Sequence, residues 1–406
     1  SVFLKIATTA VALAQQDAID VRDKTTSTEK DLTSTSHANG TYLVSAKAKD
    51  VAGNWGADAT AITVRIDTIP PDIPETPDMF VSDDTGLKDS DNITSTLRPH
   101  FIMTGLPSTL DSMRLVIDAG SSIGRDSIMS QVATDTFRVS SDLANGYHTA
   151  GIIAIDSAGN VQDTSAVLAF VVDNVAPSKP DAPDLINASD TGESNSDDLT
   201  NDNTPSILSA NLEVGSINKL FAISSDTDTT QIAVDTVETG TSQLTLTPST
   251  SISNDTYSFY SSSIDTAGNE VSSDLLEDVR IETVVPTASI VPADSLVRLE
   301  DSPLSITVTF NDGMSTSPQI AVDFAGDDDL SATEMSNTTN DSIWTYSLSI
   351  PDGNDGTATI SISGTDNAEN ALTNANTSDR TILRVDNTNP VFTLLSPDSN
   401  SYVNHA

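Results

Sequence analysis

Asp50-Val51-Ala52-Gly53-Asn54 is a motif that returns three more times along the chain. The later copies are Asp156-Ser157-Ala158-Gly159-Asn160, Asp265-Thr266-Ala267-Gly268-Asn269 and the altered Asp366-Asn367-Ala368-Glu369-Asn370. Successive copies begin at positions 50, 156, 265 and 366, which are 106, 109 and 101 residues apart. Because this spacing matches a small β-sandwich of roughly 100 residues, we expect each repeat to be a whole domain and not a solenoid turn.

A turn and an alternating stretch come before every copy of the motif. Ten residues ahead of each motif aspartate stands a turn residue: Gly40, Gly146, Asp255 or Gly356. The positions that follow alternate at period two, as in His148-Ala150-Ile152-Ala154 and Tyr257-Phe259-Ser261-Ser263, which is typical of a half-buried strand. Ala-Gly-Asn tolerates positive φ and can turn the chain into a second strand, such as 168–172. The sequence therefore predicts an all-β chain of tandem immunoglobulin-like β-sandwich domains in an extended rod.

The repeats also predict domain boundaries. Adding 106 to a residue number carries Asp67 to Asp173, Pro71 to Pro177 and Asp84 to Asp190 without a gap. We expect complete domains at 69–175, 176–285 and 286–388, the last of them divergent. The segment 1–68 is expected to be a partial domain, because residues 2–6 align with the middle strand 218–223 rather than with a secretory signal. Residues 389–406 are expected to begin a further domain.

The composition excludes several classes of function. The net charge is −41, from 59 acidic and 18 basic residues, so phosphate-rich nucleic acids are unsuitable partners and cations are natural ones. The absence of cysteine excludes disulfides, thiolate zinc sites and a cysteine nucleophile. No apolar run approaches the ~20 residues of a membrane-spanning helix.

Signals of catalysis are weak, and we expect the chain not to be an enzyme. Ser122 lies in a Gly-x-Ser-x-Gly pattern, but that pattern positions a nucleophile only where a strand turns into a helix, and no helix-period segment follows. The four histidines show no paired spacing of metal ligands.

Clustered acidic side chains predict calcium sites where two domains meet. Asp84, Asp89, Asp91 and Asn92 lie within nine residues and offer the hard oxygen ligands that Ca²⁺ prefers. In a sandwich of this topology, that loop lies at the end of its domain, next to the hairpin that carries the motif of the following domain. The candidate ligands in chain order are Asp67, Asp84, Asp89, Asp91, Asn92, Asp156, Asp173, Asp190, Asp197, Asp198, Asp265, Glu282 and Asp366. The alternative is that these Asp and Asn residues only form turns on a solvated surface.

The linker 67–71, the loops 82–94 and 189–200, the Asn-Gly turn and the Asp-x-Ala-Gly-Asn hairpin resemble the tandem bacterial Ig-like repeats of large surface adhesins and biofilm-associated proteins. The resemblance covers nearly the whole chain and is weakest in the fourth repeat, which lacks the loop at 84–94. It implies a secreted, rod-like extender at the cell surface with calcium-stiffened domain junctions, and its partners would be calcium ions and neighbouring domains of one longer chain.

Two other functions are compatible with the sequence. The chain can be a self-assembling subunit of an extracellular filament or surface layer, in which the tail of one copy pairs with an open sheet edge of the next. It can also be a carbohydrate-binding or spacer module of a secreted hydrolase, although Trp55 and Trp344 are far apart in the sequence and indicate no aromatic platform.

Overall fold

A computed structural model describes residues 2–8, 19–21, 36–103, 110–119, 127–131, 136–337, 340–373, 376–379 and 381–393. Ser122 and residues 394–406 therefore lie outside the described part of the chain. The chain divides into two compact units, Ser1–Val175 with Thr266–Asn269, and Ala176–Asp265 with Glu270–Ala406. In the described residues the only helix is the short 3-10 turn η1, Leu299–Asp301, and no helix is long and apolar enough to cross a membrane. The prediction of an all-β chain of sandwich domains is confirmed.

The first unit begins with a four-stranded sheet in the order β2-β1-β3-β4. Its strands are β1 (Val2–Ala7), β2 (Ile19–Val21), β3 (Gly40–Ala48) and β4 (Ile62–Ile66). The predicted turn residue Gly40 opens β3, which pairs antiparallel with β1 on one side and with β4 on the other. The motif at Asp50 thus lies in the connection between two neighbouring antiparallel strands, as the sequence predicts.

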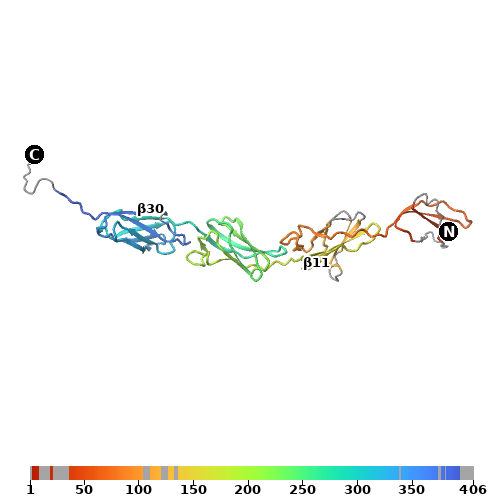
Figure 1. Ribbon diagram of the computed structural model, residues 1–406, viewed down its shortest axis with the longest axis horizontal. Helices are drawn as coiled ribbons and strands as arrows, with labels where there is room; N and C mark the ends of the chain where they lie inside the picture. The colour runs from red at the N-terminus through yellow and green to blue at the C-terminus, as the bar shows by residue number, and fades with distance from the viewer. Residues whose placement is uncertain are drawn as a thin grey trace, which may run out of the picture. The chain divides into compact units, whose positions relative to one another are not determined.

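Two sheets form the rest of the first unit, in the orders β10-β7-β5 and β6-β12-β11-β8-β9. The strands are β5 (Asp78–Met79), β6 (Ile93–Thr94), β7 (His100–Ile102), β8 (Leu110–Ile117), β9 (Ser127–Gln131), β10 (Thr136–Arg138), β11 (Gly146–Asp156) and β12 (Leu168–Val172). Figure 1 labels β11, the central strand that ends in the second copy of the motif. Between the sheets, Phe101 and Phe170 meet edge to face at 5.1 Å, and both are almost fully buried.

The second unit repeats this plan with the sheets β13-β15-β18 and β14-β21-β19-β16-β17, and β20 pairs with β19. The strands are β13 (Asp184–Leu185), β14 (Leu199–Thr200), β15 (Ile207–Ala210), β16 (Ile217–Ile223), β17 (Thr229–Thr236), β18 (Gln243–Leu246), β19 (Asp255–Ile264), β20 (Glu270–Ser272) and β21 (Leu276–Ile281). Leu220, Phe259 and Ile281 belong to a core cluster made entirely of residues between 185 and 281.

A second sandwich in this unit has the sheets β27-β28-β24-β22-β30 and β23-β31-β29-β25-β26. Its strands are β22 (Ala288–Pro292), β23 (Leu296–Val297), β24 (Leu304–Phe310), β25 (Gln319–Asp323), β26 (Leu330–Glu334), β27 (Ser336–Asn337), β28 (Ile343–Leu348), β29 (Gly356–Ser363), β30 (Thr377–Asp379) and β31 (Ile382–Val385). Figure 1 labels β30. The large core cluster here is made of residues between 288 and 385, and Trp344 is part of it rather than of a surface platform.

Candidate metal sites

The loop between β5 and β6 holds a buried carboxylate with an unused oxygen. Asp84 is only 6% exposed, and its Oδ2 accepts a hydrogen bond from the N–H of Asn92 at 3.2 Å. Its Oδ1 and the Oδ1 of Asn92 are both buried and have no hydrogen-bond partner among the described residues. Asn92 adopts a positive φ of 59°, which asparagine tolerates. Two oxygen acceptors in one loop therefore lack a donor.

Asp91 shapes the same loop and brings a second carboxylate to it. Its Oδ1 accepts the N–H of Ile93 at 3.1 Å and its Oδ2 accepts the N–H of Lys88 at 3.2 Å. A Cβ on Gly86 would lie 2.5 Å from Asp91 Oδ1, so glycine leaves room for this side chain. Burial raises the pKa of Asp84, and the negative charge of Asp91 raises it further. Asp89, by contrast, is exposed.

The second unit contains the same arrangement between β13 and β14. Asp190 is 5% exposed, and its Oδ1 is buried without a partner among the described residues. Asp197 caps the loop through the N–H groups of Ser194 and Leu199. Burial raises the pKa of Asp190 to about 6, with the nearby charge of Asp197 as the next cause in the same direction. Asp198 has a positive φ of 57°, and burial raises its pKa as well.

Both loops leave buried carboxylate oxygens without a hydrogen-bond donor among the described residues. Calcium is held by carboxylate, amide and backbone oxygens, and a buried unpaired oxygen is costly without a donor or an ion. Within the described ranges, however, no three His, Cys, Asp or Glu side chains are grouped so as to hold a metal ion. A cation in the first loop would therefore need Asn92 Oδ1 in addition to Asp84 and Asp91.

The motif aspartates are engaged in closing their hairpins. Asp156 Oδ1 accepts the N–H groups of Ala158 at 2.8 Å and Asn160 at 2.9 Å, and its Oδ2 accepts Asn160 Nδ2 at 2.8 Å. The side-chain bond from Asn160 is the largest cause that lowers the pKa of Asp156. Asp366 makes the same set of bonds in the fourth copy, and Asp265 is 6% exposed in the third. The hairpins thus use these carboxylates as turn caps.

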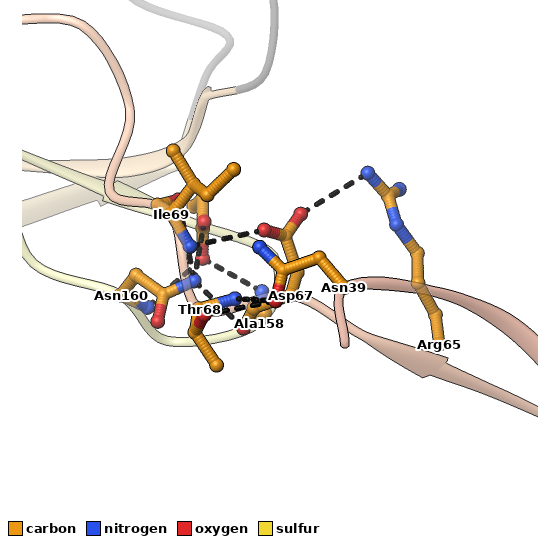
Figure 2. A network of polar contacts seen from close by, with 8 residues as sticks. Asn39, Arg65, Asp67, Thr68, Ile69, Ala158 and Asn160 are labelled. Carbon is orange, nitrogen blue, oxygen red and sulfur yellow. Dashed lines mark hydrogen bonds and ion pairs between the residues drawn. The ribbon is translucent and has the colours of Figure 1, made fainter. Parts of the chain in front are cut away.

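The asparagine that ends the second, third and fourth copies of the motif also reaches the linker before its repeat. Figure 2 shows Asn160 pointing at the linker, where its Nδ2 donates to the carbonyl of Asp67 at 3.0 Å. Asn269 Nδ2 donates to Asp173 O at 2.8 Å within the first unit, and Asn370 Nδ2 donates to Glu282 O at 2.9 Å within the second. We call this contact the asparagine latch. The sequence analysis assigned these asparagines to the turn alone. Their presence in all four copies was the one sign in the sequence that they have a further contact.

A second contact joins each of the loops of Asp84 and Asp190 to the motif hairpin of the following repeat. Thr85 Oγ1 donates to Ala267 O at 2.7 Å in the first unit, and Thr191 Oγ1 lies 3.4 Å from Ala368 O in the second. A Cβ on Gly268 would lie 2.1 Å from Thr85 O, so only glycine fits there. The loops of Asp84 and Asp190 thus contact the motif hairpins that the sequence predicted as their neighbours.

The linker acids Asp67, Asp173 and Glu282 have different hydrogen-bond and ion-pair partners. Asp67 is paired with Arg65 Nη2 at 3.2 Å (Figure 2), and Asp173 Oδ1 accepts the N–H of Val175. Glu282 contacts Arg280 at 2.6 Å. Burial raises the pKa of Glu282, and the charges of Asp312 and Asp366 act in the same direction against that of Arg280. Asp312 is a nearby acid that the sequence did not indicate.

The latch predicts a local effect of Asn160→Ala. The change removes Nδ2 from both Asp67 O and Asp156, and should lower the free energy of unfolding by about 1 kcal/mol and speed protease cleavage of the linker at 67–71. Limited proteolysis of the full chain measures this rate. Asn54→Ala is the matched control, because Asn54 makes the same bonds to Asp50 in its own hairpin. Equal cleavage of the linker in both variants would contradict the latch.

The chain is similar to one known protein family and to several solved structures. Residues 71–174 and 176–283 each match a family model described as a bacterial Ig-like domain. No curated protein matches the chain. Similar solved structures include a "tetra-tandem repeat in extending region of large adhesion protein", 16% identical with a TM-score of 0.27, covering 86% of this chain and 82% of that one. A "Ca2+-stabilized adhesin" of an Antarctic bacterium is 15% identical with a TM-score of 0.30, and the coverage is 82% and 79%.

Proposed function

The chain belongs to the bacterial Ig-like domain family, and on that premise we propose that it is a structural extender segment of a large extracellular cell-surface adhesin. The observation that carries the proposal is the asparagine latch, which joins the second, third and fourth motif hairpins to the linkers before them. A segment that spaces a distant binding domain needs such repeated junctions and no catalytic group. We place the domain boundaries at 68/69, 175/176, 285/286 and 388/389.

We further propose that calcium binds at the loops of Asp84 and Asp190. Asp84, Asp91 and Asn92 would hold the first ion. Asp190 and Asp197 would hold the second, and Asp198 would join them only by moving when the ion binds, because no three acids are grouped in the described loop. The unpaired buried oxygens Asp84 Oδ1, Asn92 Oδ1 and Asp190 Oδ1 support this assignment. The linker acid Asp173 would complete the first site, and Glu282 and Asp366 the second. A bound divalent cation would neutralise carboxylates that otherwise repel one another.

The extender role is tested by size and shape in solution. We expect the purified chain to be a monomer by light scattering, with and without calcium, and to have a larger maximum dimension in X-ray scattering when calcium is present. Asp89→Asn is the control for a non-specific charge effect, since Asp89 is exposed. Calcium-driven polymerisation would replace this proposal by the filament function, and retention on immobilised glycans would favour the carbohydrate-binding function.

A further inference from the structure

One layer of the core changes from apolar to polar between two sandwiches that otherwise share their register. In the sandwich at 69–175, Met113 lies opposite Ala154 and Leu115 opposite Ile152. In the sandwich at 176–285, Asn218 lies opposite Ser263 and Leu220 opposite Ser261. Met79 lies opposite Phe101 in the first sandwich, and Leu185 lies opposite Ile207 in the second, so Phe101 and Ile207 are equivalent positions. Two residues further along, Ser209 is therefore the equivalent of Met103. The equivalent pairs are Met103 and Ser209, Met113 and Asn218, Ile152 and Ser261, and Ala154 and Ser263.

The four polar residues of this layer are completely buried. Ser209, Asn218, Ser261 and Ser263 are each 0% exposed. Two hydroxyl pairs satisfy part of the layer: Ser209 Oγ bonds to Ser261 Oγ at 3.0 Å, and Ser263 Oγ donates to Ser216 Oγ at 3.1 Å. Neither Oδ1 nor Nδ2 of Asn218 has a hydrogen-bond partner among the described residues. A complete side-chain amide is therefore unpaired inside the core.

The size and polarity of the side chains in this layer indicate which molecule can bind there. Serine and asparagine side chains are smaller than the two methionines and the isoleucine at the equivalent positions, whereas protein interiors are otherwise close-packed. An unpaired buried amide costs roughly 1–3 kcal/mol. Space lined by polar groups takes up water, and a buried water typically makes about three hydrogen bonds. The side chains of the layer are uncharged, which favours water over an ion.

We propose that this layer is an internal hydration site, in which Asn218 binds ordered water through both atoms of its amide. The water bridges Asn218 to the hydroxyls of the neighbouring serines, so that the core of this sandwich is held by a hydrogen-bonded network where its neighbour uses apolar packing. This site is separate from the loops of Asp84 and Asp190, and the proposal does not depend on the extender function.

A crystal structure of the full chain that shows ordered water tests the proposal. We expect at least one water within hydrogen-bond distance of Asn218 Oδ1 or Nδ2. In the variant Asn218→Leu we expect that water to be lost. Met113→Leu is the control, because it alters the equivalent position in the apolar layer and should change no internal water. A dry layer in the wild-type chain, or an Asn218 amide bonded only to protein atoms, would overturn the proposal.

A second variant keeps the test decisive if Asn218→Leu does not fold. Transferring the apolar layer through Ser209→Met, Asn218→Met, Ser261→Ile and Ser263→Ala should remove the water. It should also raise the unfolding temperature of this sandwich by about 4 °C or more, because apolar packing replaces the network. Nuclear Overhauser effects from water to the Asn218 side-chain amide in the wild-type chain give an independent readout, and their absence would count against bound water.

Discussion

Saturating calcium should raise the free energy of unfolding of the sandwich formed by β13 to β21 by about 2.7 kcal/mol when the free ion stands at a hundred times its dissociation constant. The physical reason is that only the folded loop brings the carboxylates of Asp190 and Asp197 near each other, and the ion supplies the positive charge that the unpaired Asp190 Oδ1 lacks. Denaturant unfolding in calcium and in chelator measures the difference.

The variant Asp190→Asn isolates this effect. Its neutral amide removes the central ligand charge, so the calcium-dependent stabilisation should disappear while the metal-free protein keeps its fold. Asp226→Asn is the matched control, since Asp226 is exposed in the same sandwich and should leave the calcium effect intact. If the wild-type curves in calcium and in chelator coincide, the acidic residues are turn formers and the calcium proposal fails.

In chelator, the stability of the same sandwich should fall as the pH rises from about 4 to 6. The pKa of Asp190 is raised from an ordinary value of 3.8 to about 6 in the folded chain, mainly by burial. The folded state therefore holds this proton over a range in which the unfolded state has already lost it, and the resulting stability, present below pH 4, is lost through pH 6. A pKa shift of this size changes the free energy of unfolding by about 3 kcal/mol at most.

Other carboxyl groups do not reverse this trend. Burial also raises the pKa of Asp198 and Glu282, which adds to the same slope. The pKa of Asp255 is lowered by its hydrogen bond from Ser225, so its stabilising contribution is lost only as the pH falls below the ordinary value of 3.8. Asp190→Asn should flatten the profile between pH 4 and 6, measured as the unfolding temperature in chelator. An unchanged slope in that variant would show that Asp190 does not titrate in this window.

The repeat pattern alone was sufficient to predict the fold. The turn glycines at 40, 146 and 356 do open β3, β11 and β29, and the predicted partner strand at 168–172 is β12 itself. The reason is local: period-two alternation and residues tolerant of positive φ restrict each segment to a strand or a turn whatever its neighbours are. The acidic loops were also recognisable, because the residues that shape them lie close together in the sequence.

Only the tertiary structure decided which atoms of these residues remain unpaired. The sequence places Asp84, Asp91 and Asn92 in one loop, but burial of Asp84 Oδ1 depends on how that loop packs. The latch from Asn160 to Asp67 O joins groups 93 residues apart, a pairing that no local pattern encodes. Likewise, Ser261 and Ser263 stand in the alternating pattern of their strand, yet only the register with β16 sets them beside Asn218 in one polar layer. Hydrogen-bond satisfaction depends on groups brought together from distant segments, so folding decides it and sequence spacing does not.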